Sequence, residues 1–159
     1  MNRKHTADMI TKNEGVRYIV YNDTEGHPTI GIGFNLDRKD AAARLQAVNA
    51  YHGDVLSGEP LTEAQVSALF QLDLDDAIGQ ANSIVANFSE HPDPVQSVIV
   101  DMIFNLGARG FAGFTKTIAA LERMDYCSAA AQMGDSRWAQ QVPNRAKRNI
   151  GIVMDYCHA

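Results

Sequence analysis

Residues 13–34 read NEGVRYIVYNDTEGHPTIGIGF, and this stretch decides which fold the chain can form. The residues from Val16 to Asn22 are β-branched and aromatic, which is typical of a strand. A polar turn at residues 23–26 follows, and residues 27–33 predict a second short strand with a glycine-softened end. A sheet this small is not stable alone, so it must pack against helices.

The rest of the chain predicts those helices. The first dozen residues form a short helix that ends near Gly15, residues 40–51 are Ala-rich and helical, and residues 52–60 form a loop. Thr62 to Gln65 has the pattern of a capping box, and apolar residues then keep three-and-four spacing up to Val85. The predicted fold is α+β and mostly helical, with an N-terminal lobe at 1–61, an interdomain helix at 62–86 and a helical C-terminal lobe at 87–159.

Composition bounds the class of protein. A chain of 159 residues with 45% hydrophobic residues suits one globular body, or two small lobes that share a helix. The charged fraction of 21% and the mean hydropathy of −0.22 argue against disorder. Asp101 interrupts the best apolar run, SVIVDMIF, so we expect no stable membrane insertion. The N-terminus lacks the features of a secretory signal, so we expect a protein made in a cytoplasm.

The net charge and the spacing of possible metal ligands exclude further classes of protein. The net charge of −5 argues against nucleic acid as a partner. Residues 137–148 nevertheless carry four cations and no acid, either as a solvated helix face or as a patch that meets an anionic polymer or a catalytic carboxylate. The histidines have no ligand spacing, so no metal site is predicted. Cys127 and Cys157 are expected to be reduced thiols, the alternative being a bridge that ties down the C-terminal tail in an oxidising compartment.

Three side chains in the opening stretch have the chemistry of glycoside hydrolysis. Glu14 ends a helix beside an apolar segment, where burial would raise its pKa and let it donate a proton near neutral pH. Asp23 lies in a polar turn and should stay ionised, and Thr29 returns on the next strand with a hydroxyl that can orient water. On spacing alone, a helix-end carboxylate and an Asx-turn residue are the favoured interpretations of the two acids.

The whole pattern is more specific than this spacing. Its fixed positions are Glu14-Gly15-x-Arg17-x-x-x-Tyr21-x-Asp23-x-x-Gly26-x-x-Thr29-Ile30-Gly31-x-Gly33. They closely resemble the catalytic segment of the T-even phage lysozymes, glycoside hydrolase family 24. The resemblance continues in the same order over nearly the whole chain, through Thr62 with Leu69-Phe70, Ala112-Gly113-Phe114-Thr115, Ser136-Arg137-Trp138 and residues 143–148.

The resemblance implies a two-lobed lysozyme-like fold with a cleft between the lobes, and roles for single residues. Glu14 aligns with the general acid, Asp23 with the second carboxylate and Thr29 with the threonine beside the attacking water. The implied reaction is cofactor-free, inverting hydrolysis of the β-1,4 bond between N-acetylmuramic acid and N-acetylglucosamine. Supporting roles are implied for Gly33 and for Arg145 beside the acid, and substrate contacts for Asn35, Phe104, Thr117 and Gln132.

The sequence also departs from the family. Phe34 replaces a histidine that in the relatives pairs with an aspartate, here Asp73, so we expect the pH-linked stabilisation of that pair to be absent. Asn13 replaces an acid that can pair with Arg148, and the chain is acidic. These changes affect affinity for the anionic wall, not the chemistry.

The expected function is that of a phage endolysin, a monomer whose partner is bacterial peptidoglycan. It would stay in the host cytoplasm until a separate pore-forming protein, a holin, lets it reach the periplasm and the cell wall. The alternatives are a lysozyme-fold module that binds peptidoglycan without activity, a tail-associated or prophage wall hydrolase, and chitin cleavage. Glu14, Asp23 and Thr29 argue against the first of these, and the missing fusion domains argue against a tail protein.

Overall fold

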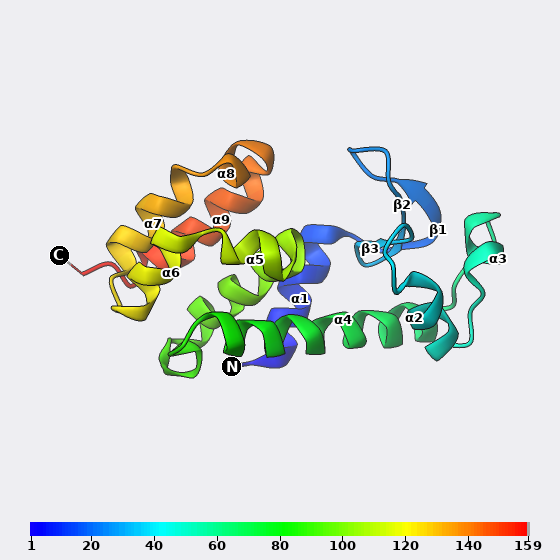
Figure 1. The fold of residues 1–159 in the computed structure, drawn as a ribbon, viewed down its shortest axis with the longest axis horizontal. Coiled ribbons are helices and arrows are strands. Elements are labelled where there is room, and N and C mark those ends of the chain that lie inside the picture. The colour runs from blue at the N-terminus through cyan, green and yellow to red at the C-terminus, as the bar shows by residue number, and fades with distance from the viewer. Residues whose placement is uncertain (159) are drawn as a thin grey trace. The chain divides into compact units, whose positions relative to one another are not determined.

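The computed structural model describes residues 1–158 and divides them into two compact units (Figure 1). We call residues 11–75 the sheet unit, and residues 1–10 with 76–158 the helical unit. Two helices, α1 (Arg3–Glu14) and α4 (Glu63–Ile84), run from one unit into the other. The lobe boundaries expected after residues 61 and 86 stay a prediction.

The sheet unit contains three antiparallel strands in the order β1-β2-β3. The two expected strands are β1 (Arg17–Asn22) and β2 (Pro28–Gly31). The sequence analysis missed β3 (Phe34–Asn35), because two residues are too few to show alternation. The second strand is shorter than the predicted residues 27–33. Gly31 and Gly33, with φ of 66° and 64°, turn the chain back toward β3.

Two short helices complete the sheet unit, and both differ from the prediction. The helix expected at residues 40–51 is shorter, as α2 (Ala41–Ala47), and Asn49 follows it with a φ of 60°. The expected loop contains α3 (His52–Leu56), whose first residue bonds through Nε2 to the carbonyl oxygen of Leu36 at 2.7 Å. A tertiary contact therefore fixes a helix too short to be recognised from sequence.

The capping box at the start of α4 is confirmed. Gln65 N donates to Thr62 Oγ1 at 3.1 Å, and Thr62 N donates back to Gln65 Oε1 at 2.9 Å. This exchange satisfies backbone groups that a helix start leaves unpaired. Val66, Leu69 and Leu74 on the same helix are buried, as the spacing predicts.

The helical unit is built around α5 (Asp93–Ala112), most of whose first half is buried. Gly107 has a φ of 76° and kinks the helix, which then resumes. The remaining elements are η1 (Phe88–Glu90), α6 (Thr115–Glu122), α7 (Tyr126–Gly134), α8 (Arg137–Gln141) and α9 (Pro143–Met154). Within residues 1–158 no single helix is long and apolar enough to cross a membrane; α5 and α6, bent by 105°, pass that test only as a pair, on length and composition.

Asp73 pairs with Arg38, a pair that the sequence did not predict, and its Oδ1 also lies 3.9 Å from Arg44 Nη1. Arg38 Nη1 donates to Asp73 Oδ2 at 2.8 Å, while its Nε and Nη2 donate to Asp40 at 2.9 Å each. The guanidinium also lies over the buried ring of Phe34, 4.4 Å from its centroid. Burial lowers the pKa of Arg38, but its bonds to Asp40 and Asp73 outweigh burial and raise it above its ordinary value. Where the family resemblance implied a titratable histidine, this chain has a permanent cation stacked on phenylalanine.

Replacing Asp73 tests this exchange. We expect Asp73→Asn to lower the free energy of unfolding by about 1–3 kcal/mol, because Arg38 loses a partly buried partner. The loss should be equal at pH 5 and pH 8, since the cation of this pair is an arginine, which stays charged throughout this range. Urea unfolding at both values measures it, with the exposed Asp54→Asn as the control. A loss that shrinks as pH rises would indicate a histidine partner instead.

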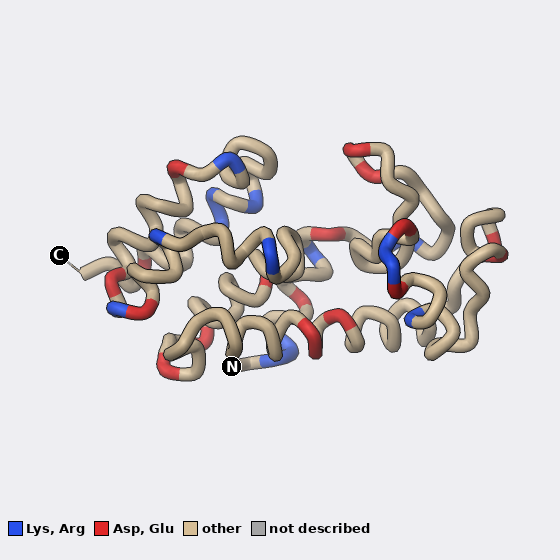
Figure 2. The backbone as a smooth tube through the Cα atoms, viewed as in Figure 1, with Lys and Arg blue, Asp and Glu red and all other residues tan. Residues whose placement is uncertain are grey.

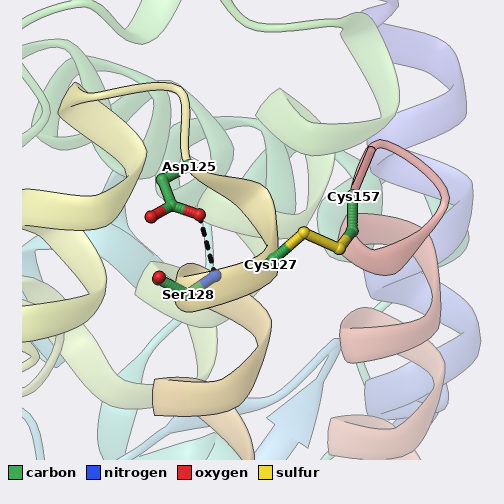
Figure 3. Close-up of a disulfide and its surroundings, with 4 residues drawn as sticks. All are labelled: Asp125, Cys127, Ser128 and Cys157. Atoms are coloured by element: carbon green, nitrogen blue, oxygen red, sulfur yellow. Dashed lines mark hydrogen bonds between the residues drawn. A yellow bond between two sulfur atoms is a disulfide. The ribbon is translucent and has the colours of Figure 1, made fainter. Parts of the chain in front are cut away.

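Cys127 and Cys157 form a disulfide, so the expected pair of reduced thiols is wrong (Figure 3). Cys127 lies in the first turn of α7, which begins where Asp125 accepts a hydrogen bond from Ser128 N at 3.0 Å. Cys157 lies three residues after the end of α9, and the two Cα atoms are 4.7 Å apart. Because α7 packs along α9, the fold itself brings together two sulfurs that are 30 residues apart in sequence.

Removing the bridge should cost stability. A loop of 30 residues predicts that Cys127→Ser lowers the free energy of unfolding by about 3–4 kcal/mol, because the unfolded chain regains the freedom that the bridge removed. Guanidinium unfolding with and without a reductant measures this loss. The reductant should destabilise the wild type and leave Cys127→Ser unchanged; equal stability of the reduced and oxidised wild type would contradict the prediction.

Candidate active site

Glu14 is the last residue of α1, and its carboxyl group lies against the turn between β2 and β3. A Cβ atom on Gly33 would lie 2.7 Å from Glu14 Oε2 and 2.9 Å from its Cδ, closer than such atoms approach. The Glu14 carboxyl therefore occupies the place that a side chain at residue 33 would take. The structure thus brings two of the predicted site residues into contact.

Asp23 and Thr29 are both tied to the backbone of His27. Asp23 Oδ1 accepts from His27 N at 2.8 Å and from Glu25 N at 2.9 Å, so Asp23 also forms the Asx turn that spacing alone favours. Thr29, which is only 4% exposed, donates from Oγ1 to the carbonyl oxygen of His27 at 3.0 Å. Both peptide groups of one residue therefore fix the predicted carboxylate and the predicted hydroxyl.

Tyr21 stands close to both acids, although the sequence analysis gave it no role. It pairs with Thr29 across β1 and β2, and the Arg17 guanidinium lies 5.1 Å from the centroid of its ring. Burial and then the charge of Glu14 raise the pKa of Tyr21; Arg17 opposes the rise and Asp23 adds to it. The signal was available, because Arg17 and Tyr21 are fixed positions of the quoted pattern.

Asn35 pairs with Thr29 across β2 and β3. Its side-chain oxygen Oδ1 accepts a hydrogen bond from Asp37 N at 2.8 Å, so it shapes the turn after β3. Its expected contact with substrate stays a prediction.

The helical unit contains a cavity of about 500 Å³ that includes two of the predicted substrate contacts, Thr117 on α6 and Gln132 on α7. Phe114 and Trp138 form an edge-to-face pair there, with ring centroids 6.3 Å apart. Phe104, half-buried on α5, does not line this cavity. The other lining residues are Leu106, Gly113, Thr115, Lys116, Asp135, Ser136, Arg137 and Gln141.

Arg145 is 7% exposed and bonds to Asp101 on α5. Its Nε donates to Asp101 Oδ2 at 3.0 Å and its Nη2 to Oδ1 at 2.8 Å, while Asn149 Nδ2 donates to Oδ2 at 2.8 Å. The sequence analysis missed this pair, although an acid inside the apolar run SVIVDMIF requires a buried partner. Arg145 belongs to the helical unit and Glu14 to the sheet unit, so its expected place beside the acid stays a prediction.

The two units differ in charge. The sheet unit holds five basic and ten acidic residues and therefore carries the entire net charge of −5, whereas the helical unit holds nine of each sign. All charged residues on helices α8 and α9 are basic, as Figure 2 shows.

Among residues 1–158, no three His, Cys, Asp or Glu side chains form a group that could hold a metal ion.

Comparison with known proteins decides the family. A family model described as phage lysozyme matches residues 11–153. The chain belongs to the phage lysozyme family. The expected family, its mostly helical α+β fold and its enzyme class are confirmed, and the chain is a lysozyme-type peptidoglycan hydrolase.

Individual relatives agree with this assignment. This phage lysozyme family member is 30% identical over 155 residues to probable T4-type lysozyme 1 of Dictyostelium discoideum, covering 92% of this chain and 91% of the relative. It is 31% identical over 156 residues to the pre-baseplate central spike protein Gp5 of Enterobacteria phage T4, covering 93% of this chain but only 27% of that protein. It is 29% identical over 124 residues to the endolysin of Salmonella phage P22, covering 76% of this chain and 73% of the relative.

Two glycines with nearly the same φ allow a controlled test of the Glu14 contact in this lysozyme. We expect Gly33→Ala to lower peptidoglycan hydrolysis at least about tenfold, because its Cβ would displace the Glu14 carboxyl and small misplacements of catalytic groups are costly. Gly31→Ala has the same backbone strain, but its Cβ would meet only Val66 at 3.6 Å. Each variant should lose roughly 1–2 kcal/mol of stability.

The turbidity of a wall suspension measures the activity of both folded variants. Equal losses of activity in the two would show that backbone strain, and not contact with Glu14, explains the effect.

Proposed function

We propose that this lysozyme hydrolyses the β-1,4 bond between N-acetylmuramic acid and N-acetylglucosamine with inversion, and that it acts as an endolysin. The observation that carries the proposal is the shared anchoring of Asp23 and Thr29 to His27, in the unit that also holds Glu14 against Gly33. A carboxylate and a hydroxyl held by the two peptide groups of one residue can position a single water molecule.

The hydrogen bonds determine how such a water would be oriented. Thr29 Oγ1 gives its only hydrogen to the His27 carbonyl, so toward a water molecule it can only accept. The Asp23 carboxylate is likewise an acceptor, and its Oδ2 forms no hydrogen bond within residues 1–158. A water that donates one hydrogen to each has its lone pair left to attack the anomeric carbon. Asp23 would take the proton as general base, and Glu14 would protonate the leaving oxygen.

The substrate contacts proposed are Asn35 in the sheet unit and Phe104, Thr117 and Gln132 in the helical unit. Thr117 and Gln132 line the 500 Å³ cavity together with aromatic rings and with Lys116 and Arg137. Aromatic rings beside hydrogen-bonding side chains can contact both the apolar face and the polar groups of a sugar. The two cations favour the carboxylates of an anionic cell wall.

The protein would act as a monomer without a cofactor. A separate pore-forming protein would release it from the host cytoplasm to the periplasm and the cell wall. Similarity to the P22 endolysin supports this role. The Cys127–Cys157 disulfide supports the final compartment, because such bonds persist in an oxidising periplasm and are rare in cytosol.

A tail-associated hydrolase is the second candidate, and the 31% identity to the phage T4 spike protein favours it. Immunoblots of purified virions and of infected cells before lysis separate the two. A tail protein remains with the virions, whereas an endolysin is found in the cells and is absent from purified virions.

Single substitutions test the chemistry. We expect Glu14→Gln to lower release of reducing ends from purified peptidoglycan by about 10²- to 10⁴-fold, because it removes the general acid. Glu25→Gln, an exposed acid in the same hairpin, should keep full activity. NMR of the first product should show the α-anomer, as inversion at a β-bond requires.

Each result bears on a separate part of the proposal. Full activity of folded Glu14→Gln would remove Glu14 from the acid role, and an initial β-anomer would exclude inversion. A wild type that binds peptidoglycan without releasing reducing ends would be a binding module.

A further inference from the structure

The sheet unit contains a second cavity, of about 220 Å³, that none of the predicted site residues lines. It lies between the chain around α3 and the start of α4. Its walls include Asn49, Tyr51, Asp54, Glu59, Leu61 and Gln65.

Hydrogen bonds hold the walls of this cavity in place. Gln65 Nε2 donates to the carbonyl oxygens of Val48 at 3.1 Å and Asn49 at 3.3 Å, which joins α4 to the segment after α2. Glu59 N donates to the Asp54 carbonyl at 3.0 Å, and Leu61 N donates to the carbonyl of Tyr18 on β1 at 2.8 Å. A cavity built in this way needs little ordering when a ligand binds.

The side chains around the cavity favour a neutral, hydroxyl-rich ligand with an apolar face. Tyr51 is 77% exposed, which leaves its ring open as a flat surface. Asp54 and Glu59 line the cavity and form no ion pair within residues 1–158, so their carboxylates can accept hydrogen bonds from hydroxyl or amide groups. Its volume is more than about ten times the space that one water molecule needs. A cavity of this size suits a sugar ring better than a single ion.

The charge of the cavity walls restricts which sugar could bind. No lysine or arginine lines the cavity, and the whole sheet unit is acidic. An acidic sugar would meet two carboxylates, and like charges in contact are costly. N-acetylmuramic acid carries a carboxylate unless its peptide masks it, whereas N-acetylglucosamine is neutral.

We propose that this cavity binds an N-acetylglucosamine unit of a glycan strand, with the pyranose ring on Tyr51 and its hydroxyl and amide groups donating to Asp54 and Glu59. The inference rests on the proposed function, because it makes the cavity a second attachment point on the polymer that the active site cleaves. Two points of attachment raise the effective concentration of the glycan without any new contact at the active site.

Amide chemical shifts test the binding directly. The probe is the N-acetylglucosamine tetramer, titrated into Glu14→Gln protein so that it is not cleaved. We expect shifts of the amides of residues 49–61 and of Gln65. Adding Tyr51→Ala should weaken this response at least about tenfold. Leu56→Ala removes an exposed apolar side chain at the end of α3, the helix whose N-cap is Tyr51, and should bind like the parent.

Hydrolysis measured separately shows whether the site serves the enzyme. Tyr51→Ala in the active protein should release reducing ends several-fold more slowly from insoluble wall, and at the wild-type rate from soluble wall fragments. The proposal is overturned if the tetramer leaves amides 49–61 unmoved, if Tyr51→Ala and Leu56→Ala bind equally, or if both substrates are cleaved at the wild-type rate.

The two proposals can fail independently. If the wild type releases no reducing ends while the tetramer still shifts amides 49–61, the proposed hydrolysis fails and the cavity remains a glycan site. If hydrolysis is normal and those amides do not move, only the cavity proposal fails.

Discussion

The predicted active site depends on the close approach of the Gly33 backbone to the Glu14 carboxyl. This contact joins the end of α1 to the turn between β2 and β3, two segments that no hydrophobic pattern connects. It also explains the glycines of the opening stretch, since the turn needs positive φ at residues 31 and 33 and the acid needs a missing side chain at residue 33. Any side chain there would move Glu14 relative to Asp23 and Thr29, which the backbone of His27 in the turn between β1 and β2 holds in place.

Charge is divided between the units in a way that suits an acidic protein with an anionic target. The acidic excess lies in the sheet unit, and the uninterrupted run of cations lies on α8 and α9. The helical unit would therefore attract an anionic wall, because Arg137, Lys147 and Arg148 on it are exposed. Arg145, in the same run, is buried and serves its own unit by neutralising Asp101.

The parts of the structure that the sequence predicts are those with a local cause. The capping box of α4, the hairpin of β1 and β2 and the proximity of Asp23 and Thr29 all follow from neighbouring residues. Long-range contacts explain what was missed. The α3 helix depends on a bond to Leu36, Arg38 reaches Asp73 across 35 residues of sequence, and α7 must pack on α9 before Cys127 meets Cys157.

The disulfide has a consequence for the damaged protein. Cys127 and Cys157 enclose α8 and α9, and between them lie Gln132, Trp138 and Arg145. A single proteolytic cut anywhere inside this loop would leave both fragments covalently joined, so α9 would stay attached to the helices it covers. In the reduced protein the same cut would allow the C-terminal fragment to leave. The bridge would therefore keep the fragments of a cleaved chain together. This effect matters most where extracytoplasmic proteases act.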